Sequence, residues 1–271
     1  MKERDFQMAV LEYDDTVLVR DDMGQWRVFT DMVPRWSDDK VYTFPVTEPH
    51  LVEDRYVEDN SETAQHYKKD VNLYYAWRTC TLQKIHLPHL VLDAKSGNSA
   101  QALIHEGASP ETILVPNNTS SALEMPRGPI VVAESVQDLF QIPSPVRDVL
   151  LPRTFGSVFL DLMCCHITII NHFESTLRSI LERMDNHSLL GLTYTQRSGT
   201  AKITNESFVR ITASPDPFVQ KNLNPCETLQ LFLNHLAGLY DIILVLDNFY
   251  KYNNMYTKFY RVVKMNTPLK K

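Results

Sequence analysis

The stretch from residue 89 to residue 99 reads His-Leu-Val-Leu-Asp-Ala-Lys-Ser-Gly-Asn-Ser. It opens with apolar residues that fit a short buried strand ending at Asp93. A turn follows at Gly97, and a helical pattern then begins at Asn98, which is the expected N-cap, while Gly107 is placed to end that helix. A buried strand, a tight turn and a helix in this order predict one unit of a parallel sheet.

Further apolar runs repeat this unit toward the C-terminus. We expect these strands at 112–115, 129–133, 157–162, 188–194, 241–246 and 256–264. Continuous apolar strands that alternate with helices predict an α/β fold with a mostly parallel sheet covered on both faces. The last two strands are separated by a short turn at Asn253-Asn254, which predicts an antiparallel hairpin.

Three helices are expected from the spacing of apolar residues. The first runs from about Glu62 to Thr79, before the first parallel strand. The second is one long amphipathic helix with a stripe from Ile170 to Met184. The third carries a stripe from Leu229 to Leu236.

The N-terminal region has a different character. Up to His66 the chain holds 16 acidic and 7 basic residues, against 17 and 20 in the remainder. We expect short antiparallel strands at 8–11, 16–20, 25–29 and 40–44, followed by an acidic linker. The chain therefore divides, by prediction, into an acidic β module with its linker (1–60) and a larger α/β domain (61–271).

Composition excludes several classes of protein. The chain of 271 residues is long enough to bury a core without a metal or disulfides, and its four cysteines do not form a zinc-binding or disulfide pattern. Apolar runs are too short to span a bilayer, and no signal-peptide core follows Met1. We therefore expect an intracellular protein, cytoplasmic or nuclear, with no membrane partner.

The segment from Leu90 to Ser99 resembles the first motif of class I S-adenosylmethionine-dependent methyltransferases. In that family an apolar strand is followed by Asp-x-Gly-x-Gly-x-Gly. Here Lys95 and Ser99 replace two of the glycines and Gly97 remains, so the glycine motif is degenerate. The resemblance covers roughly His89 to Met265. It implies a Rossmann-like, seven-stranded sheet closed by an antiparallel hairpin, and S-adenosyl-L-methionine as the cofactor.

The resemblance implies that Asp93, Ala94, Gly97 and Asn98 bind the methionine end of the cofactor. A glycine suits such a turn because it tolerates positive φ, and the Asp93 carboxylate would meet the ammonium group. The alternative is that Asp93 caps the next helix and Gly97 is an ordinary turn residue.

Three further strand ends would complete the site. Asn117 would bind the ribose hydroxyls, Glu134 the adenine amino group, and Asp161 would act as the catalytic residue that orients the acceptor or removes its proton. Each has a structural alternative. Asn117 fits a turn after a proline, Glu134 a helix start, and Asp161 a capping or core position.

Other clusters are better explained by structure than by chemistry. The pair Cys164-Cys165 is expected to be buried and inert, and His86 and His89 lack a third metal ligand, so no metal site is predicted. Aromatic residues of the N-terminal strands form either a small core or a cage for a methylated lysine. These are Trp26, Trp36, Tyr42 and Phe44.

The predicted function is S-adenosylmethionine-dependent methyl transfer to an unidentified acceptor. The alternative is a catalytically inactive, methyltransferase-like adaptor or binding protein. The family's signature for methylating amino groups of bases, Asn/Asp-Pro-Pro-Tyr/Phe, is missing after the fourth strand of the sheet. From Phe249 to Lys271 the chain has six basic residues and no acid, so nucleic acid is a possible partner through this basic C-terminal strand.

Overall fold

A computed structural model describes residues 7–10, 17–20, 26–28, 61–94, 96–119, 128–132, 134–141, 151–195, 202–206, 208–209 and 224–265. The strands are β1 (Gln7–Val10), β2 (Val17–Arg20), β3 (Trp26–Val28), β4 (His89–Val91), β5 (Ile113–Pro116), β6 (Ile130–Val132), β7 (Phe155–Cys165), β8 (Met184–Thr195), β9 (Ile242–Tyr252) and β10 (Met255–Lys264). The helices are α1 (Glu62–Thr81), α2 (Asn98–His105), the short 3-10 helix η1 (Pro110–Thr112), α3 (Val136–Gln141), α5 (His166–His172), α6 (Glu174–Arg183) and α9 (Pro225–Gly238). No described helix is both long and apolar enough to cross a membrane.

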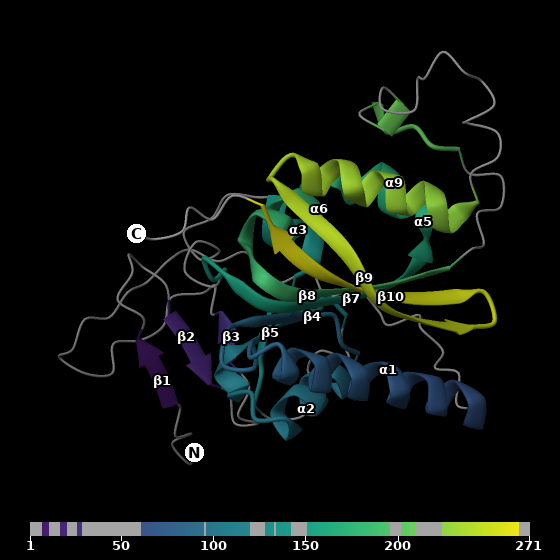
Figure 1. Ribbon diagram of the computed structural model, residues 1–271. Coiled ribbons are helices and arrows are strands. Elements are labelled where there is room, and N and C mark those ends of the chain that lie inside the picture. Colours follow the sequence, from purple (N-terminus) through teal and green to yellow (C-terminus); the bar gives the residue numbers. More distant parts are fainter. Residues whose placement is uncertain are drawn as a thin grey trace.

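The strands form one sheet in the order β1-β2-β3-β6-β5-β4-β7-β8-β10-β9. From β6 to β8 all neighbours are parallel, whereas β10 runs antiparallel to both β8 and β9. Seven strands, β4 to β10, thus form a mostly parallel sheet closed by an antiparallel hairpin (Figure 1). This is a Rossmann-like sheet, and the predicted α/β fold class is confirmed.

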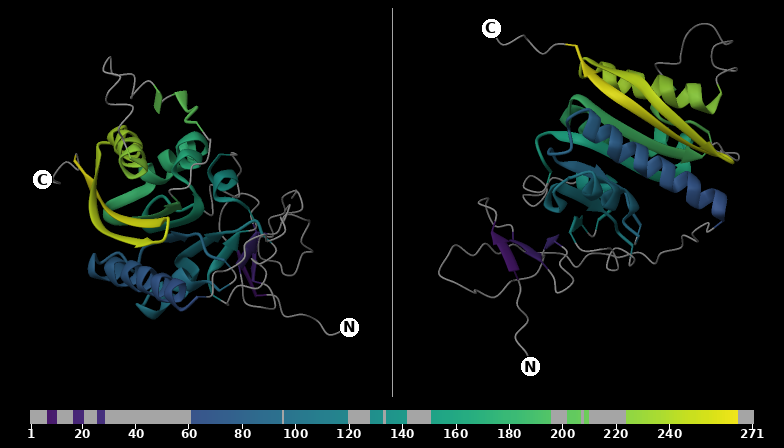
Figure 2. Two further views of the ribbon diagram at one scale, coloured as in Figure 1. Left: turned by 90° about the vertical axis from the view of Figure 1, so that its right-hand side faces the viewer. Right: turned by 60° about the horizontal axis from the view of Figure 1, so that its bottom comes forward.

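Helices cover both faces of the sheet (Figures 1 and 2). On one face α3, α5, α6 and α9 pack on a core that includes Leu90, Val158 and Leu160. On the other face α1 and α2 pack on a second core that includes Val91 and Phe159. Successive strand residues alternate between the two cores, which explains why the strands read as continuous apolar runs.

The prediction of one long helix from Ile170 to Met184 is wrong, because this stretch forms two helices, α5 and α6. α5 ends at His172, Phe173 leaves helical geometry with φ −111° and ψ 8°, and Met184 already belongs to β8. The Asn205 side chain donates to the Ile170 carbonyl oxygen at 2.9 Å, so the break leaves that carbonyl satisfied. Both helices pack on the same core, so apolar residues continue at helical spacing across the break, and the sequence pattern does not reveal it.

The N-terminal strands β1, β2 and β3 form the expected antiparallel meander. β3 is parallel to β6, with Trp26 opposite Ile130, so the meander extends the edge of the large sheet. The fourth expected strand, at 40–44, and the linker up to residue 60 lie outside the described residues, as do Trp36, Tyr42 and Phe44. The division near residue 60 and the aromatic cage therefore stay predictions.

His89 holds a buried polar cluster rather than a metal. Its Nε2 donates to the Ile85 carbonyl oxygen at 3.1 Å, and its Nδ1 accepts from the Ser157 hydroxyl at 2.8 Å. Ser157 Oγ also lies 2.6 Å from the Tyr75 hydroxyl. Both ring nitrogens are occupied and His86 is exposed, so the two histidines do not form a ligand pair. Burial lowers the pKa of His89 to about 4, which keeps the ring neutral.

This cluster predicts an acid-sensitive fold. The folded pKa of His89 lies below the ordinary value, so as pH falls below about 6.5 the unfolded chain takes up a proton that the folded chain refuses. As pH falls from 7 to 4, this difference should lower the free energy of unfolding by about 3 kcal/mol. We expect urea unfolding of His89→Gln to show a shallower loss over this range than the wild type. The exposed His86→Gln is the control, and equal slopes in all three proteins would contradict the assignment.

Candidate active site

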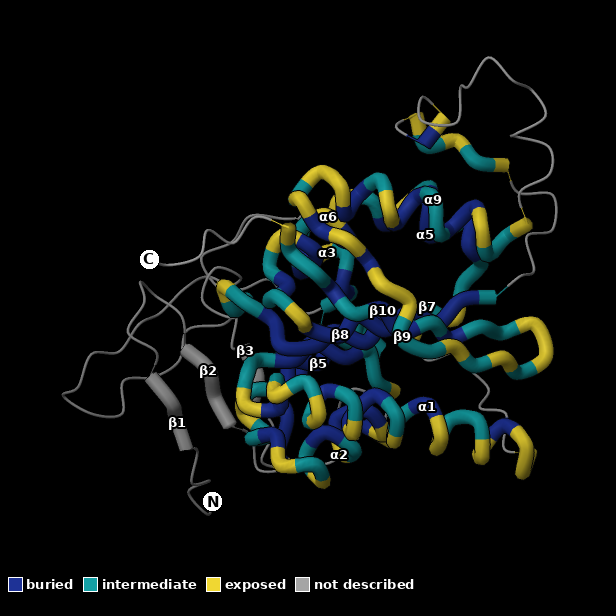
Figure 3. Tube along the Cα trace, viewed as in Figure 1, coloured by how far each residue is buried: buried dark blue, intermediate teal, exposed yellow. Residues whose placement is uncertain are grey.

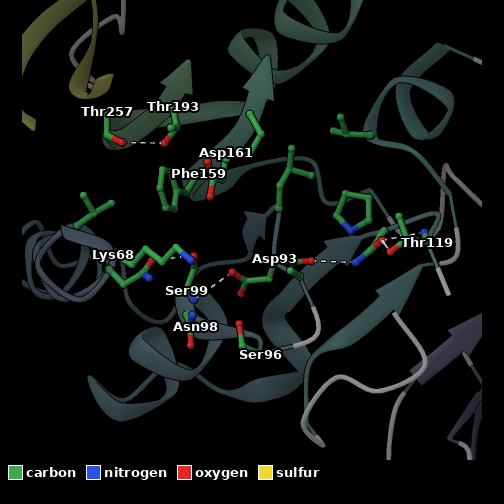
Figure 4. A pocket seen from close by; sticks show the side chains of 18 of the residues that line it. Lys68, Asp93, Ser96, Asn98, Ser99, Thr119, Phe159, Asp161, Thr193 and Thr257 are labelled. Carbon is green, nitrogen blue, oxygen red and sulfur yellow. Dashed lines mark hydrogen bonds between the residues drawn. The ribbon is translucent and has the colours of Figure 1, made fainter. Parts of the chain in front are cut away.

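A cavity of about 380 Å³ opens at the carboxyl ends of the parallel strands. Its lining includes residues that follow β4, β5 and β6, residues of β7, β8 and β10, and one face of α1 (Figure 4). Sequential strands are neighbours from β4 outward to β6, and the order then reverses at β7 on the other side of β4. Ligands of open α/β sheets bind at such a point, and the volume lies within the range of small-molecule sites.

Asp93 fixes the turn between β4 and α2. Its Oδ1 accepts from the Ser99 backbone N–H at 3.1 Å, and its Oδ2 accepts from the Ala100 N–H at 2.7 Å. Gly97 stands at the N-cap position with φ 58°, the positive value expected for it. The expectation that Asn98 is the N-cap is wrong: Asn98 is the first residue of α2. The free backbone amides at the start of α2 are capped by the Asp93 side chain, which lies at the end of β4 and not at the residue next to the helix.

Asp161 lies beside Asp93, because the two residues lie near the carboxyl-terminal ends of neighbouring parallel strands, β7 and β4. Val91 of β4 is paired with Phe159 of β7, so the residues two positions further on, Asp93 and Asp161, follow in register. Both carboxylates line the cavity (Figure 4). Burial raises the pKa of Asp93, although its hydrogen bonds to the α2 amides oppose the shift.

Asp161 occupies an irregular part of β7. The register with β8 shifts after Asp161, and Met163 has a left-handed φ of 43°. Water reaches the Asp161 side chain from the cavity, but the surrounding protein still raises its pKa to about 6, chiefly by desolvation and then by the Asp93 charge. Thr193 and Lys68 oppose that shift. A carboxyl group that titrates near 6 is suited to accept a proton at neutral pH.

Asn117 ties the ends of β4 and β5 together. Its Nδ2 donates to the Asp93 carbonyl oxygen at 3.0 Å. Its Oδ1 accepts from Thr119 twice, from the backbone N–H at 2.9 Å and from the hydroxyl at 2.8 Å. Both lone pairs of that amide oxygen are therefore occupied in this structure. Asn117 also lines the cavity, together with Asn118 and Thr119.

The remaining predicted site residues divide into two groups. Ala94 and Asn98 line the cavity, and Gly97 lies between the lining residues Ser96 and Asn98. Glu134 is not among the lining residues, although the three residues after it, 135 to 137, are. Its predicted contact with an adenine amino group stays a prediction.

Sequence reasoning missed the side of the cavity formed by α1 and β10. The Tyr67 hydroxyl of α1 lies 2.6 Å from Thr257 Oγ1. Thr257 Oγ1 in turn lies 2.8 Å from Thr193 Oγ1 (Figure 4). Lys68 lines the same side. Because β10 runs antiparallel, Thr257 near its start reaches the level at which the parallel strands end. Recognising this required the strand order, which local pattern does not give.

The cysteine pair does not line the cavity. Burial raises the pKa of Cys164 to about 12, so this cysteine is a thiol at neutral pH. The expectation that both cysteines are buried and inert is wrong for Cys165, which is half-buried: although burial opposes the shift, hydrogen bonds with Thr168 lower its pKa. Within the described part of the chain, no three His, Cys, Asp or Glu side chains gather to hold a metal ion.

The pKa of Asp161 predicts that this residue destabilises the ligand-free protein at neutral pH. The folded chain holds its proton up to about pH 6, whereas the unfolded chain releases it near pH 4, so stability is lost as pH rises between these values. Asp161→Asn should therefore raise the melting temperature at pH 7.5 and give a smaller gain at pH 4. The exposed Glu182→Gln should show no such pattern. A lower melting temperature for Asp161→Asn at pH 7.5 would refute this explanation.

No family model matches the chain, and no curated protein matches it. Solved structures of several methyltransferases are similar to this chain. One is magnesium protoporphyrin IX methyltransferase (ChlM) from Synechocystis PCC 6803 with bound SAM, at 10% identity and a TM-score of 0.44, covering 77% of this chain and 86% of that one. Trm1 from Pyrococcus horikoshii with S-adenosyl-L-methionine has 12% identity and a TM-score of 0.45, covering 79% and 59%. The O-methyltransferase from Bacillus cereus in complex with SAH has 14% identity and a TM-score of 0.44, covering 77% and 84%. Similarity at this level does not assign an activity to the chain.

Proposed function

We propose that this protein transfers a methyl group from S-adenosyl-L-methionine to an acceptor bound beside Asp161. The observation that carries the proposal is the cavity itself. It combines the Asp93 strand end, the Gly97 turn and the Asp161 carboxylate at the point where the strand order reverses. A structural protein has no need for two carboxylates at one cavity, because desolvation raises the pKa of both and the Asp93 charge raises that of Asp161 further.

The residues around Asp93 fit the methionine end of this cofactor. Each oxygen of the Asp93 carboxylate accepts one backbone N–H and retains a lone pair that an ammonium group would use. The side chains of Ser96 and Asn98 are exposed and line the same part of the cavity. Gly97 has no side chain to narrow it.

The nucleoside end would lie beyond Asn117. In the present geometry Asn117 holds Thr119 in place, so we assign the ribose contacts to Asn117 and its neighbours Asn118 and Thr119 together. The adenine ring would then lie toward residues 135–137, with Glu134 next to them in the chain.

The cofactor would supply an electrophilic methyl group on a sulfonium. The chain's own contribution is to hold and deprotonate the acceptor. Asp161, ionised above about pH 6, would accept a hydrogen bond or a proton from an acceptor N–H or O–H group. The hydroxyl groups of Tyr67, Thr257 and Thr193 form a chain along the same wall and would orient polar groups of the acceptor.

The basic residues of β10, Lys258, Arg261 and Lys264, are half-buried, so their charge is less available to the phosphates of a nucleic acid than the sequence suggests.

Calorimetry on the full chain tests the proposal. We expect both S-adenosylmethionine and S-adenosylhomocysteine to bind. Asp93→Asn should weaken binding of S-adenosylmethionine by roughly 10- to 150-fold, the range for a hydrogen bond between charged groups. Glu182→Gln, which changes an exposed residue outside the cavity lining, should bind like the wild type.

If the folded wild type binds neither compound, the chain is better explained as a catalytically inactive, methyltransferase-like adaptor or binding protein. If both bind and Asp93→Asn binds equally well, the assignment of Asp93 fails while the cofactor assignment stands.

A further inference from the structure

Within the part of the chain that the structure describes, the outer edge of β9 is apolar and is not paired with a strand. β9 has one described neighbour, β10, so its other edge lacks a strand partner. Four large apolar side chains on β9 are exposed: Ile243, Val245, Leu246 and Phe249. The run from Ile242 to Leu246 holds no charged residue. Monomeric proteins usually protect such an edge with charges, prolines or a covering element, because it can pair with another strand.

α1 adds a second apolar strip beside this edge. Leu73 and Trp77 point away from the core, and about half of each side chain is exposed. With Asp70, Tyr74 and the β9 residue Tyr250, they line a shallow groove of about 370 Å³. We call the exposed side chains of Leu73 and Trp77, together with Ile243, Val245, Leu246 and Phe249, the edge surface. Figure 3 shows that exposed residues recur along both α1 and β9.

The two halves of the edge surface are held rigidly together. Asp247 of β9 accepts from Arg78 Nε at 2.6 Å and from Arg78 Nη2 at 2.8 Å. The Tyr74 hydroxyl donates to the same carboxylate at 2.6 Å. This bidentate pair is mostly shielded from solvent and locks α1 against β9. The surface is thus preorganised, which lowers the cost of binding.

We propose that the edge surface binds a second copy of this chain, with the two β9 strands antiparallel about a two-fold axis. The charges on β9 favour this occupant. An exposed aspartate, Asp241, precedes the strand, and an exposed lysine, Lys251, lies near its end. Antiparallel pairing brings Asp241 of each copy toward Lys251 of the other. The one charged residue between these two contacts on each strand, Asp247, is already paired with Arg78 of its own copy. A two-fold interface requires such self-complementarity.

The exposed area is of the right size for a dimer. With large apolar side chains of about 150–250 Å² each, half exposed, the six residues of the edge surface present on the order of 600 Å². Stable interfaces bury roughly 800 Å² per partner, and the paired backbone and the neighbouring Tyr250 would supply the remainder. This inference does not depend on the proposed methyl transfer.

Sedimentation equilibrium of the full chain over a concentration series tests the proposal. The wild type should be a dimer at micromolar concentration. Val245→Lys places a charge in the uncharged run and should raise the dissociation constant at least tenfold. Val209→Lys is the matched control, because Val209 is as exposed as Leu73, at 47% against 46%, but belongs to a different segment outside the edge surface. It should dimerise like the wild type.

Two further variants separate dimerisation from misfolding. Trp77→Lys changes an exposed helix position and should also weaken the dimer about tenfold with an unchanged circular dichroism spectrum. Lys251→Glu places like charges together at both ends of the interface and should weaken the dimer by roughly two- to fivefold at low salt. A wild type that stays monomeric at 100 μM would overturn the proposal. So would a dimer that Val245→Lys and Trp77→Lys leave intact.

Discussion

The Asp93 carboxylate, bound to the backbone amides of Ser99 and Ala100, is the constraint on which the site depends. It joins the end of β4 to the start of α2 and so sets where the chain turns. Asn117 binds the Asp93 carbonyl oxygen, which brings the end of β5 to the same point. β7 lies in register on the other side of β4 and places Asp161 next to Asp93. One aspartate thus aligns three strand ends around a single cavity.

This arrangement works against stability. Two neighbouring carboxylates repel, and their environment raises both pKa values, that of Asp161 to about 6. β7 is irregular just beyond Asp161, and Met163 adopts a left-handed backbone conformation there. Strain and unfavourable charge that persist in one place are typical of functional sites. The surrounding fold supports them with two apolar cores and with the Arg78–Asp247 pair, which ties α1, one wall of the cavity, to the sheet.

Much of this could be read from the sequence. The strand–helix rhythm predicted the parallel sheet and the terminal hairpin, and the family resemblance placed Asp93 and Asp161 in one site. The failures have a common cause in long-range contacts. Asn98 is a residue type that often caps helices, but the Asp93 carboxylate accepts the hydrogen bonds from the first amides of α2. The break at Phe173 is stabilised by Asn205, 32 positions away. The contribution of Tyr67 and Thr257 depends on β10 inserting between β8 and β9.

The central claim is that the cavity between Asp93 and Asn117 holds S-adenosylmethionine. A crystal structure of the full chain grown with S-adenosylhomocysteine tests it most directly. The account predicts electron density for the amino-acid end at Asp93, for the ribose near Asn117 and Thr119, and for the sulfur facing Asp161. Crystals grown at saturating ligand that leave this cavity without the compound, or that hold it elsewhere on the protein, would contradict the account.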